Sequence, residues 1–207
     1  SPGTRKLLAI IFSVASLAVI FAFFYYRGVN RSEDPRVAEA REHMAEYDRL
    51  SGENEGVDLF FLLDSAESIY RRVPGYGSSY ETGVIYNNKA SRLLLKALYD
   101  SSLTSAEKAA LLELSVSYCD SAVSVYRNWL AEWDPLTEEE VSKRLTDVMS
   151  ESDPAFKGLN FSRVFRKRVK DTMLARIETP RRLSVSYTNK GTAYRHMTMP
   201  DSALVYY

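Results

Sequence analysis

The sequence contains few of the residues on which metal centres, disulfide scaffolds and fibrous chains depend. Its 207 residues include one cysteine, Cys119, and two histidines, His43 and His196. A single cysteine forms no intrachain disulfide and no multi-cysteine metal site, and two histidines leave little for a histidine-rich centre. With nine glycines and seven prolines, the chain is not collagen-like and not of low complexity. What remains is a globular chain of one large domain or two small ones.

An excess of charge is also absent, because 27 Lys and Arg residues balance 27 Asp and Glu residues. Nucleic-acid-binding proteins usually have a clear basic excess, so we predict no nucleic-acid partner. The balance is uneven along the chain. Residues 132–153 hold eight acidic and two basic side chains, and residues 163–182 hold eight basic and two acidic ones.

The common catalytic motifs are missing as well. The chain has no glycine-rich nucleotide-binding loop, no His-Glu-x-x-His and no Gly-x-Ser-x-Gly. Cys119 has no histidine near it in sequence, which favours a packed small residue over a nucleophile. Glu39, His43 and Glu46 share a helix face, but without a further ligand nearby they are better interpreted as a solvated surface. We therefore predict no enzymatic activity, no cofactor and no small-molecule substrate.

One long hydrophobic run is present, since residues 7–26 contain no charged side chain. At about 1.5 Å of rise per residue, a helix of this length crosses the roughly 30 Å hydrocarbon core of a bilayer. Tyr25 and Tyr26 stand where an interfacial aromatic belt belongs, and Arg27 follows them. A cleaved signal peptide would have a shorter apolar region and end in small residues. We therefore predict a retained anchor, with residues 1–27 as tail and transmembrane helix.

Two further properties of the predicted anchor concern its orientation and its packing. Arg5 and Lys6 precede the span, while several arginines follow it, so the positive-inside signal is nearly balanced. A short tail with two adjacent basic residues favours a cytoplasmic N-terminus and an extracytoplasmic helical domain. Ala15, Ala18 and Ala22 share one face, which is a candidate for close packing against another membrane helix. A lipid-facing surface is the alternative for these alanines.

The remainder of the chain shows helical periodicity. Residues 28–34 form a short polar linker, and residues 35–207 contain no stretch of sustained apolar–polar alternation, so we predict an all-α domain. Thr104 and Glu107 have the spacing of a capping box. The expected helices span about 35–50, 57–73, 81–99, 105–133, 137–150, 162–177 and 183–197, and a last helix starts at Pro200.

Two short motifs recur in this domain. The first, Asp-Ser-Ala-x-x-x-Tyr, begins at Asp64, Asp120 and Asp201, and is called the Asp motif below. The second, Tyr-x-Asn-Lys followed by Ala or Gly, begins at Tyr86 and Tyr187, and is called the Lys motif. The Asp-Ser pair is typical of a helix N-cap. We expect the small residue of each motif to permit close helix approach, and the tyrosine of the Asp motif to fill the adjacent groove.

The two motifs resemble those of the tetratricopeptide repeat family, whose repeat is a pair of antiparallel helices. The resemblance is clear in residues 184–207, moderate in 81–133 and weak in 35–73, and residues 135–182 match nothing assignable. Lys190 stands where the family usually has Leu. The positions that match are Tyr187, Gly191 and Tyr194 on the first helix and Ala203 and Tyr207 on the second.

The resemblance implies a divergent, irregular α-solenoid of helical hairpins, with an ordinary helical bundle as the alternative. Arrays of this kind end in a polar capping helix, and Tyr207 falls inside an expected helix, so we expect the domain to be truncated at its C-terminus. The family binds peptides or partner segments in a groove lined by the first helices, which implies that other protein subunits are the partners here. The Lys and Asn pattern of its chaperone-tail clamps is absent. The implied groove positions are Val84, Asn87, Ser91, Leu94 and Leu95, and Val185, Thr188, Thr192, Arg195 and His196.

The basic stretch is amphipathic, because apolar residues recur at four-residue steps from Phe165 to Ile177. One interpretation is a surface for anionic lipid headgroups or an acidic partner. The other is that the apolar face packs on the domain and the basic side chains pair with the acidic stretch, which the opposite charges favour. The candidate surface residues are Arg163, Arg166, Lys167, Arg168 and Lys170.

These observations predict a membrane-anchored, tetratricopeptide-like scaffold that mediates protein–protein interaction within a larger membrane-associated assembly. Two alternatives stay open. The chain is a subunit of a motor or secretion machine held by its transmembrane helix, or it is the sensory or tethering part of a longer signalling enzyme.

Overall fold

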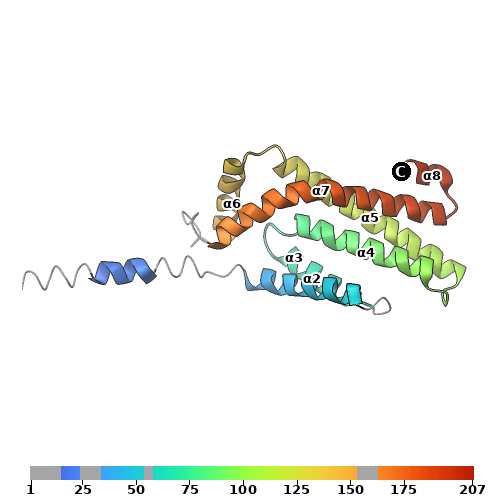
Figure 1. The fold of residues 1–207 in the computed structure, drawn as a ribbon, viewed down its shortest axis with the longest axis horizontal. Helices are drawn as coiled ribbons and strands as arrows, with labels where there is room; N and C mark the ends of the chain where they lie inside the picture. The colour runs from blue at the N-terminus through green and yellow to red at the C-terminus, as the bar shows by residue number, and fades with distance from the viewer. Residues whose placement is uncertain (1–14, 24–33, 54–57, 153–162) are drawn as a thin grey trace, which may run out of the picture.

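A computed structural model describes residues 15–23, 34–53, 58–152 and 163–207. These residues are helical or irregular and include no strand, so the all-α prediction is confirmed (Figure 1). The helices after residue 34 are α2 (Pro35–Glu53), α3 (Phe60–Arg72), α4 (Tyr80–Tyr99), α5 (Ser105–Trp133), α6 (Glu138–Ser152), α7 (Arg163–His196) and α8 (Pro200–Leu204).

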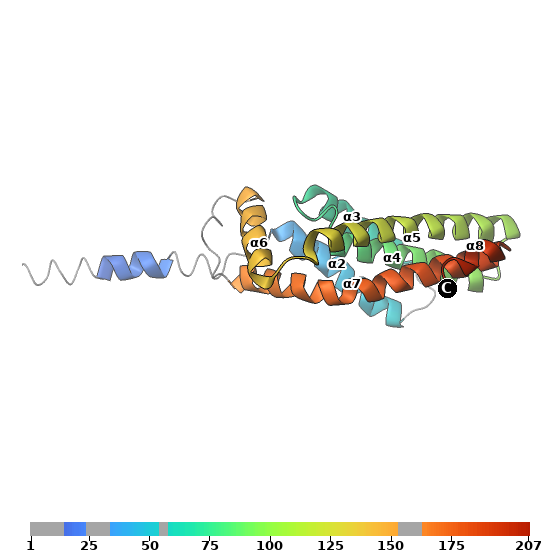
Figure 2. The same ribbon diagram turned by 90° about the horizontal axis from the view of Figure 1, so that it is seen from above.

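Helices α4 and α5 form an antiparallel pair at the centre of the domain (Figures 1 and 2). Gly83, near the start of α4, faces the ring of Tyr126, near the end of α5. Further along α4, the carbonyl of Ala90 accepts a hydrogen bond from the Ser115 hydroxyl at 2.8 Å. Small residues at these points let the two helices approach closely, as the sequence predicts for the alanine of the Lys motif.

Helix α7 lies along this pair and runs parallel to α4. The Ser186 hydroxyl donates to the Asn87 side-chain oxygen at 2.8 Å, and the Asn189 amide donates to the Ser91 hydroxyl at 2.8 Å. Because the residue numbers increase along both helices from the first hydrogen bond to the second, α4 and α7 are parallel. Helix α8 then folds back on α7, where Gly191 lies against the backbone carbonyl of Ala203.

Local signals in the sequence explain where two of the helices begin. Helix α5 starts with the predicted capping box, in which Thr104 accepts from the Glu107 backbone and Glu107 accepts from the Thr104 backbone. Thr137 and Glu140 repeat this arrangement at α6. Such a cap is worth about 1 kcal/mol, because it satisfies backbone donors that have no partner inside the helix.

Among the residues that the structure describes, the core comprises three clusters placed along the domain. Each fully buried Leu, Val or Tyr removes apolar surface from water and contributes about 1.5–3 kcal/mol. The first cluster joins α2, α3 and the start of α4, the second joins the end of α5 to α6 and α7, and the third joins α4, α5 and α7. Central members are Val37, Leu63 and Tyr70 in the first, Trp129, Val141 and Phe165 in the second, and Leu94, Leu112 and Ala193 in the third.

The prediction of two helices at 162–177 and 183–197 was wrong, because α7 is continuous from Arg163 to His196 with Pro180 inside it. A proline in a helix interior removes one backbone hydrogen bond and costs about 3 kcal/mol. Burial on both sides offsets this cost, since Ala175 and Thr179 before the proline and Ser186 after it are buried. The exposed Pro180 lies on the opposite, solvent side.

Residues 15–23 form a helix whose large apolar side chains, including Leu17 and Phe21, are exposed. Ala15, Ala18 and Ala22 are exposed on it as well. The rest of the predicted anchor, the N-terminal tail and residues 28–33 of the predicted linker lie outside the described residues. Within the part of the chain that the structure describes, no helix combines the length and the hydrophobicity required to span a bilayer.

The close approach of α4 and α5 at Gly83 gives a stability test. A Cβ atom built on Gly83 would lie 2.4 Å from a ring carbon of Tyr126, which is itself fully buried. We expect Gly83→Ala to lower the free energy of unfolding by about 1–3 kcal/mol, measured by chemical denaturation, because the ring has no room to retreat.

Gly52→Ala is the matched control, since nothing lies within 4 Å of that Cβ position on α2. It should raise stability by about 0.5–1 kcal/mol through helix propensity alone. Equal effects of the two substitutions would contradict the tight contact at Gly83.

Candidate functional site

The Asp motifs do not begin helices as their Asp-Ser pairs predicted. Asp64 lies within α3 and Asp120 lies in the middle of α5, and only Asp201 falls in the first turn of a helix. The N-cap interpretation was therefore wrong for the first two copies. The alanine of every copy is buried, as expected of a close-contact position: Ala66, Ala122 and Ala203.

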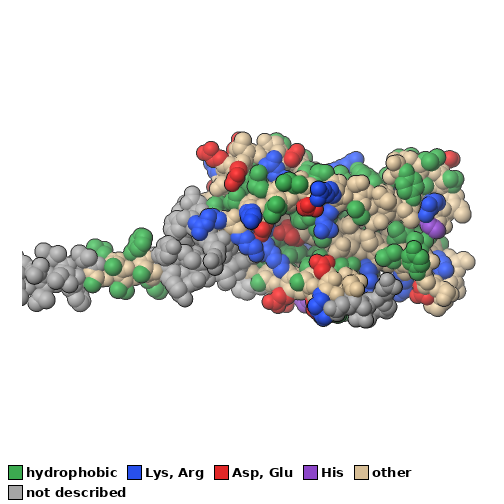
Figure 3. Space-filling view, in the orientation of Figure 1, with side chains coloured by type: hydrophobic (Ala, Val, Ile, Leu, Met, Phe, Trp, Pro, Cys, Tyr) green, Lys and Arg blue, Asp and Glu red, His purple; other side chains and the backbone are tan. Residues whose placement is uncertain are grey.

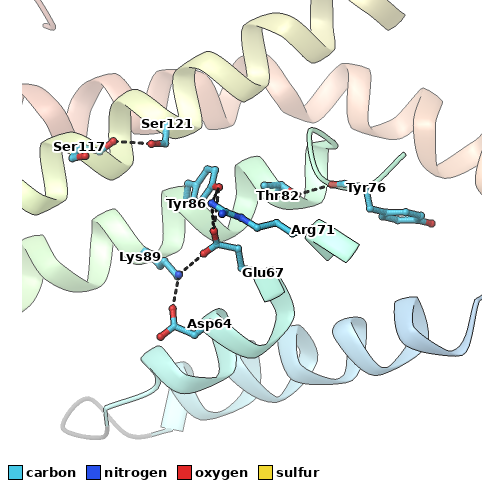
Figure 4. A network of polar contacts seen from close by, with 9 residues as sticks. All are labelled: Asp64, Glu67, Arg71, Tyr76, Thr82, Tyr86, Lys89, Ser117 and Ser121. Atoms are coloured by element: carbon cyan, nitrogen blue, oxygen red, sulfur yellow. Dashed lines mark hydrogen bonds and ion pairs between the residues drawn. The ribbon is translucent and has the colours of Figure 1, made fainter. Parts of the chain in front are cut away.

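The first two Asp motifs instead face Lys motifs across helix interfaces. Lys89 on α4 is only 2% exposed, and its ammonium group forms ion pairs with Asp64 and Glu67 of α3, each at 2.5 Å (Figure 4). Burial by itself lowers the pKa of Lys89, but the hydrogen bonds to both carboxylates raise it more, so the pKa lies above its ordinary value. Lys89 is therefore charged, and it holds α4 against α3.

The same contact recurs one helix pair later. Lys190 on α7 forms an ion pair with Asp120 of α5 at 2.5 Å. Its ammonium group also lies 4.4 Å from the ring centroid of Tyr206. Burial by itself lowers the pKa of Lys190, but its hydrogen bonds to Asp120 and Tyr206 raise the pKa by more than burial lowers it. The pKa therefore lies above its ordinary value, and this lysine too is held in its charged form. The two Lys–Asp ion pairs thus join three helix pairs, which are α2 with α3, α4 with α5, and α7 with α8.

A hydrogen-bonded network extends the first of these contacts (Figure 4). Arg71 donates to the Tyr86 hydroxyl at 2.9 Å, and that hydroxyl donates to Glu67 at 3.1 Å. Nearby, the buried hydroxyl of Thr82 donates to the backbone carbonyl of Tyr76 at 2.7 Å and fixes the loop before α4. Because each polar group in this network has a partner, the α3–α4 interface tolerates its burial.

The predicted groove positions on α4 do not form one open surface. Asn87 and Leu94 are buried between helices, so their assignment to a partner-binding groove was wrong. Asn87 is used internally, as acceptor for Ser186 of α7. Val84 and Ser91 are half-buried, and Leu95 is exposed.

The corresponding positions on α7 are more accessible. Val185, Thr188, Arg195 and His196 are exposed. The half-buried Thr192 lies 3.1 Å from the hydroxyl of Tyr207. These side chains lie along the C-terminal half of α7, where α8 folds back.

A groove of about 930 Å³ lies between α6 and the N-terminal half of α7, in the segment that matched no repeat. Its floor is apolar, and two of its residues, Leu174 and Ile177, are exposed. Figure 3 shows acidic and basic side chains gathered at this end of the molecule. The charged groups that line the groove are Asp134, Glu138 and Glu139 on one side and Arg166, Lys170 and Arg176 on the other.

The basic amphipathic stretch agrees in part with the second interpretation, in which it packs on the domain and pairs with acidic side chains. Phe165 is buried in the second core cluster and Val169 and Met173 pack against it, so this part of the apolar face packs on the domain, whereas Ile177 at its end is exposed. Arg176 pairs with Asp134 of the acidic stretch and donates to its backbone carbonyl and to that of Leu136. Arg168, by contrast, pairs with Glu81 of α4 at 2.9 Å.

The ion pair with Arg168 changes the pKa of Glu81. Burial raises its pKa, but the charge of Arg168 together with hydrogen bonds lowers it more, so the carboxylate is stabilised in its charged form. Arg166, Lys167 and Lys170 are exposed, and Arg163 is the first residue of α7. Arg166 and Lys170 are therefore exposed at the border of the groove, whereas Arg168 belongs to the interior of the domain.

Cys119 is fully buried in α5, and burial raises the pKa of its thiol to about 12. A thiol at that pKa is protonated at neutral pH and is a poor nucleophile. No group of three potential metal-ligating side chains is found among the residues described. Comparison of the chain with protein-family models, curated proteins and solved structures finds no match.

The buried lysines give a second stability test. Lys89→Met removes the cation that faces Glu67, which is only 13% exposed, and we expect a loss of about 3 kcal/mol in the free energy of unfolding. Lys190→Met should cost less, about 1–2 kcal/mol, because its carboxylate partner Asp120 is half exposed. Urea denaturation monitored by circular dichroism measures both values.

Lys96→Met on the exposed side of α4 is the control and should change stability by no more than about 0.5 kcal/mol. If Lys89→Met were as mild as this control, the lysine would not hold α4 to α3.

Proposed function

We propose that this chain is a membrane-anchored, tetratricopeptide-like scaffold that binds other proteins within a larger membrane-associated assembly. The observation that supports the proposal best is the repeated stacking of helix pairs through Asp64–Lys89 and Asp120–Lys190. Stacked helix pairs build extended surfaces and are a common architecture for binding partner proteins. In this proposal the polar network between α3 and α4 stabilises the stack, and the apolar groove between α6 and α7, which charged side chains border, is the surface left for a partner.

The anchor is supported by the uncharged run of residues 7–26 and by the helix at 15–23, whose apolar side chains face outward. Exposure of Leu17, Phe21 and their neighbours to water is unfavourable, whereas exposure to lipid tails is not. In this proposal the N-terminus is cytoplasmic and the helical domain is extracytoplasmic.

Partner binding is assigned to the groove between α6 and α7. Its volume of about 930 Å³ lies in the range of ligand pockets, and it accommodates the side chains of one face of a helix or an extended segment. The apolar floor supplies the binding energy. Acidic groups on α6 and basic groups on α7 select a partner segment that carries both signs of charge.

A second candidate function is a subunit of a motor or secretion machine held by its transmembrane helix. The exposed face formed by Ala15, Ala18 and Ala22 favours it, because small residues permit close packing of membrane helices. Both candidates require the anchor, and they differ in whether assembly depends on this face.

The anchor is tested by placing charge in it. The double variant Leu17→Arg with Ile20→Arg should release most of the protein from membranes, because each arginine at the centre of a span costs about 2.5–3.5 kcal/mol. Extraction of membranes with alkaline carbonate measures the released fraction. The conservative pair Leu17→Ile with Ile20→Leu should stay in the pellet. Release of both pairs alike would argue against a membrane-spanning helix.

The groove is tested by site-specific photocrosslinking in intact membranes. A benzophenone amino acid at Leu174, in the groove, should crosslink a discrete partner, whereas one at Leu114 on α5 should not. The two positions are matched, since they are 50% and 45% exposed. Lys170→Glu should reduce the Leu174 product severalfold by reversing charge at the border of the groove. Equal products at both positions, or no effect of Lys170→Glu, would contradict the assignment.

A further inference from the structure

The first turns of α7 present a basic face to solvent. Arg166, Lys167 and Lys170 are exposed, and with about 3.6 residues per helical turn their positions fall within a stripe about 100° wide. Among the described residues, no ion pair involves Lys167 or Lys170. The α7 side chains that do form ion pairs there are Arg168, Arg176, Arg181 and Lys190. The charge of the two lysines is therefore available to a partner outside the domain.

This face lies at the end of the domain that is nearest in sequence to the predicted anchor. Helices α2 and α7 begin at the same end of the domain in both ribbon views (Figures 1 and 2). Arg41 of α2 lines one small pocket with Arg168 and Asp171 of α7, so the N-terminal parts of the two helices lie close together. Figure 3 shows Lys and Arg side chains gathered at this end. The basic face is therefore next to the place where the chain enters the domain.

The length of chain between the anchor and α2 limits the distance of this end from the membrane. Eight residues, 27–34, separate the uncharged run of residues 7–26 from Pro35, the first residue of α2. An extended chain gains at most about 3.6 Å per residue, so α2 begins within about 30 Å of the surface of a membrane that residues 7–26 span. The tether thus keeps the basic face near the headgroups at a high effective concentration, and contacts that are weak for a free protein suffice.

We propose that Arg166, Lys167 and Lys170 dock the domain on anionic lipid headgroups of the membrane that holds the anchor. A negatively charged membrane surface attracts Lys and Arg side chains that follow a membrane span, and the attraction falls off within about 8–10 Å at physiological salt. Docking fixes which side of the domain faces the bilayer. This inference rests on the proposed anchor, and it adds a lipid partner to the protein partner proposed for the groove.

Lipid headgroups fit this face better than an acidic protein does. A membrane with anionic lipids is a charged surface that the anchor keeps within reach at all times, whereas an acidic protein has to be recruited. Lysine is a strongly hydrated point charge on a flexible stem. Such a group is attracted by a diffuse anionic surface without a defined geometry of contacts, which is how basic clusters beside membrane spans act.

The test follows the approach of α7 to the headgroups in nanodiscs that hold one full chain each, so that a second copy is excluded as occupant. Leu174→Cys, one turn beyond Lys170 on the same face, carries a bimane fluorophore, while Cys119 is fully buried and stays unlabelled. A lipid with a nitroxide on its headgroup quenches the fluorophore at close range. Quenching should be at least about twofold stronger in discs with about 30% phosphatidylglycerol than in discs of phosphatidylcholine alone.

Three comparisons show whether this difference comes from the basic face. Salt at about 0.5 M should remove the difference, because it screens exposed charges. Arg166→Glu with Lys167→Glu should remove it too, because an anionic surface repels the reversed charges. Lys96→Glu with Arg195→Glu makes the same change in charge at exposed positions near the ends of α4 and α7, and should preserve the difference.

A fluorophore at Leu95→Cys on α4 is the positional control, since Leu95 is 49% exposed and Leu174 is 50% exposed. Its quenching should be the same in both kinds of disc. Circular dichroism of the Arg166→Glu, Lys167→Glu chain should match that of the parent, because both positions are exposed.

The outcomes separate this inference from the proposed function. An inserted chain whose Leu174 fluorophore is quenched equally in both lipids, or whose quenching ignores Arg166→Glu with Lys167→Glu, would overturn lipid docking alone. It would leave the anchor and the groove as they are. A chain that does not co-purify with the discs would overturn the anchor and, with it, this inference.

Discussion

The ion pair between a buried lysine and a carboxylate of an adjacent helix earlier in the chain is the contact on which the stacking of this domain depends. An isolated ammonium group between helices is costly, because water no longer solvates it. Lys89 and Lys190 avoid that cost only when their helices lie in one register against α3 and α5. The pairs add little net stability compared with apolar side chains, but they exclude other registers.

Close packing works together with this electrostatic constraint. Gly83 lets the ring of Tyr126 fill the space between α4 and α5, and Gly191 lets α8 lie on α7. These contacts join α4 to α5 and α7 to α8, whereas the lysines join α4 to α3 and α7 to α5. Packing therefore sets the distance within the first set of helix contacts, and charge sets the register of the second.

Residues 135–182 depart from this regular stacking and add a surface of their own. Helix α6 and the N-terminal half of α7 pack through Val141, Leu145 and Phe165, which leaves a groove above their buried side chains. Because α7 passes through Pro180 without a break, the groove is rigidly joined to the stacked pairs. A partner held in the groove would be positioned relative to the whole domain.

The sequence by itself determined the all-α fold, most helix boundaries and the capping box at Thr104, because these follow from periodicity and from interactions within a few residues. It also contained the two motifs. Only the tertiary structure decided that the first two Asp motifs lie within helices and pair with the Lys motifs, that Asn87 and Leu94 are buried, and that α7 is continuous. These properties depend on contacts between residues far apart in the chain, and burial on both sides of Pro180 overrides the local preference for a break.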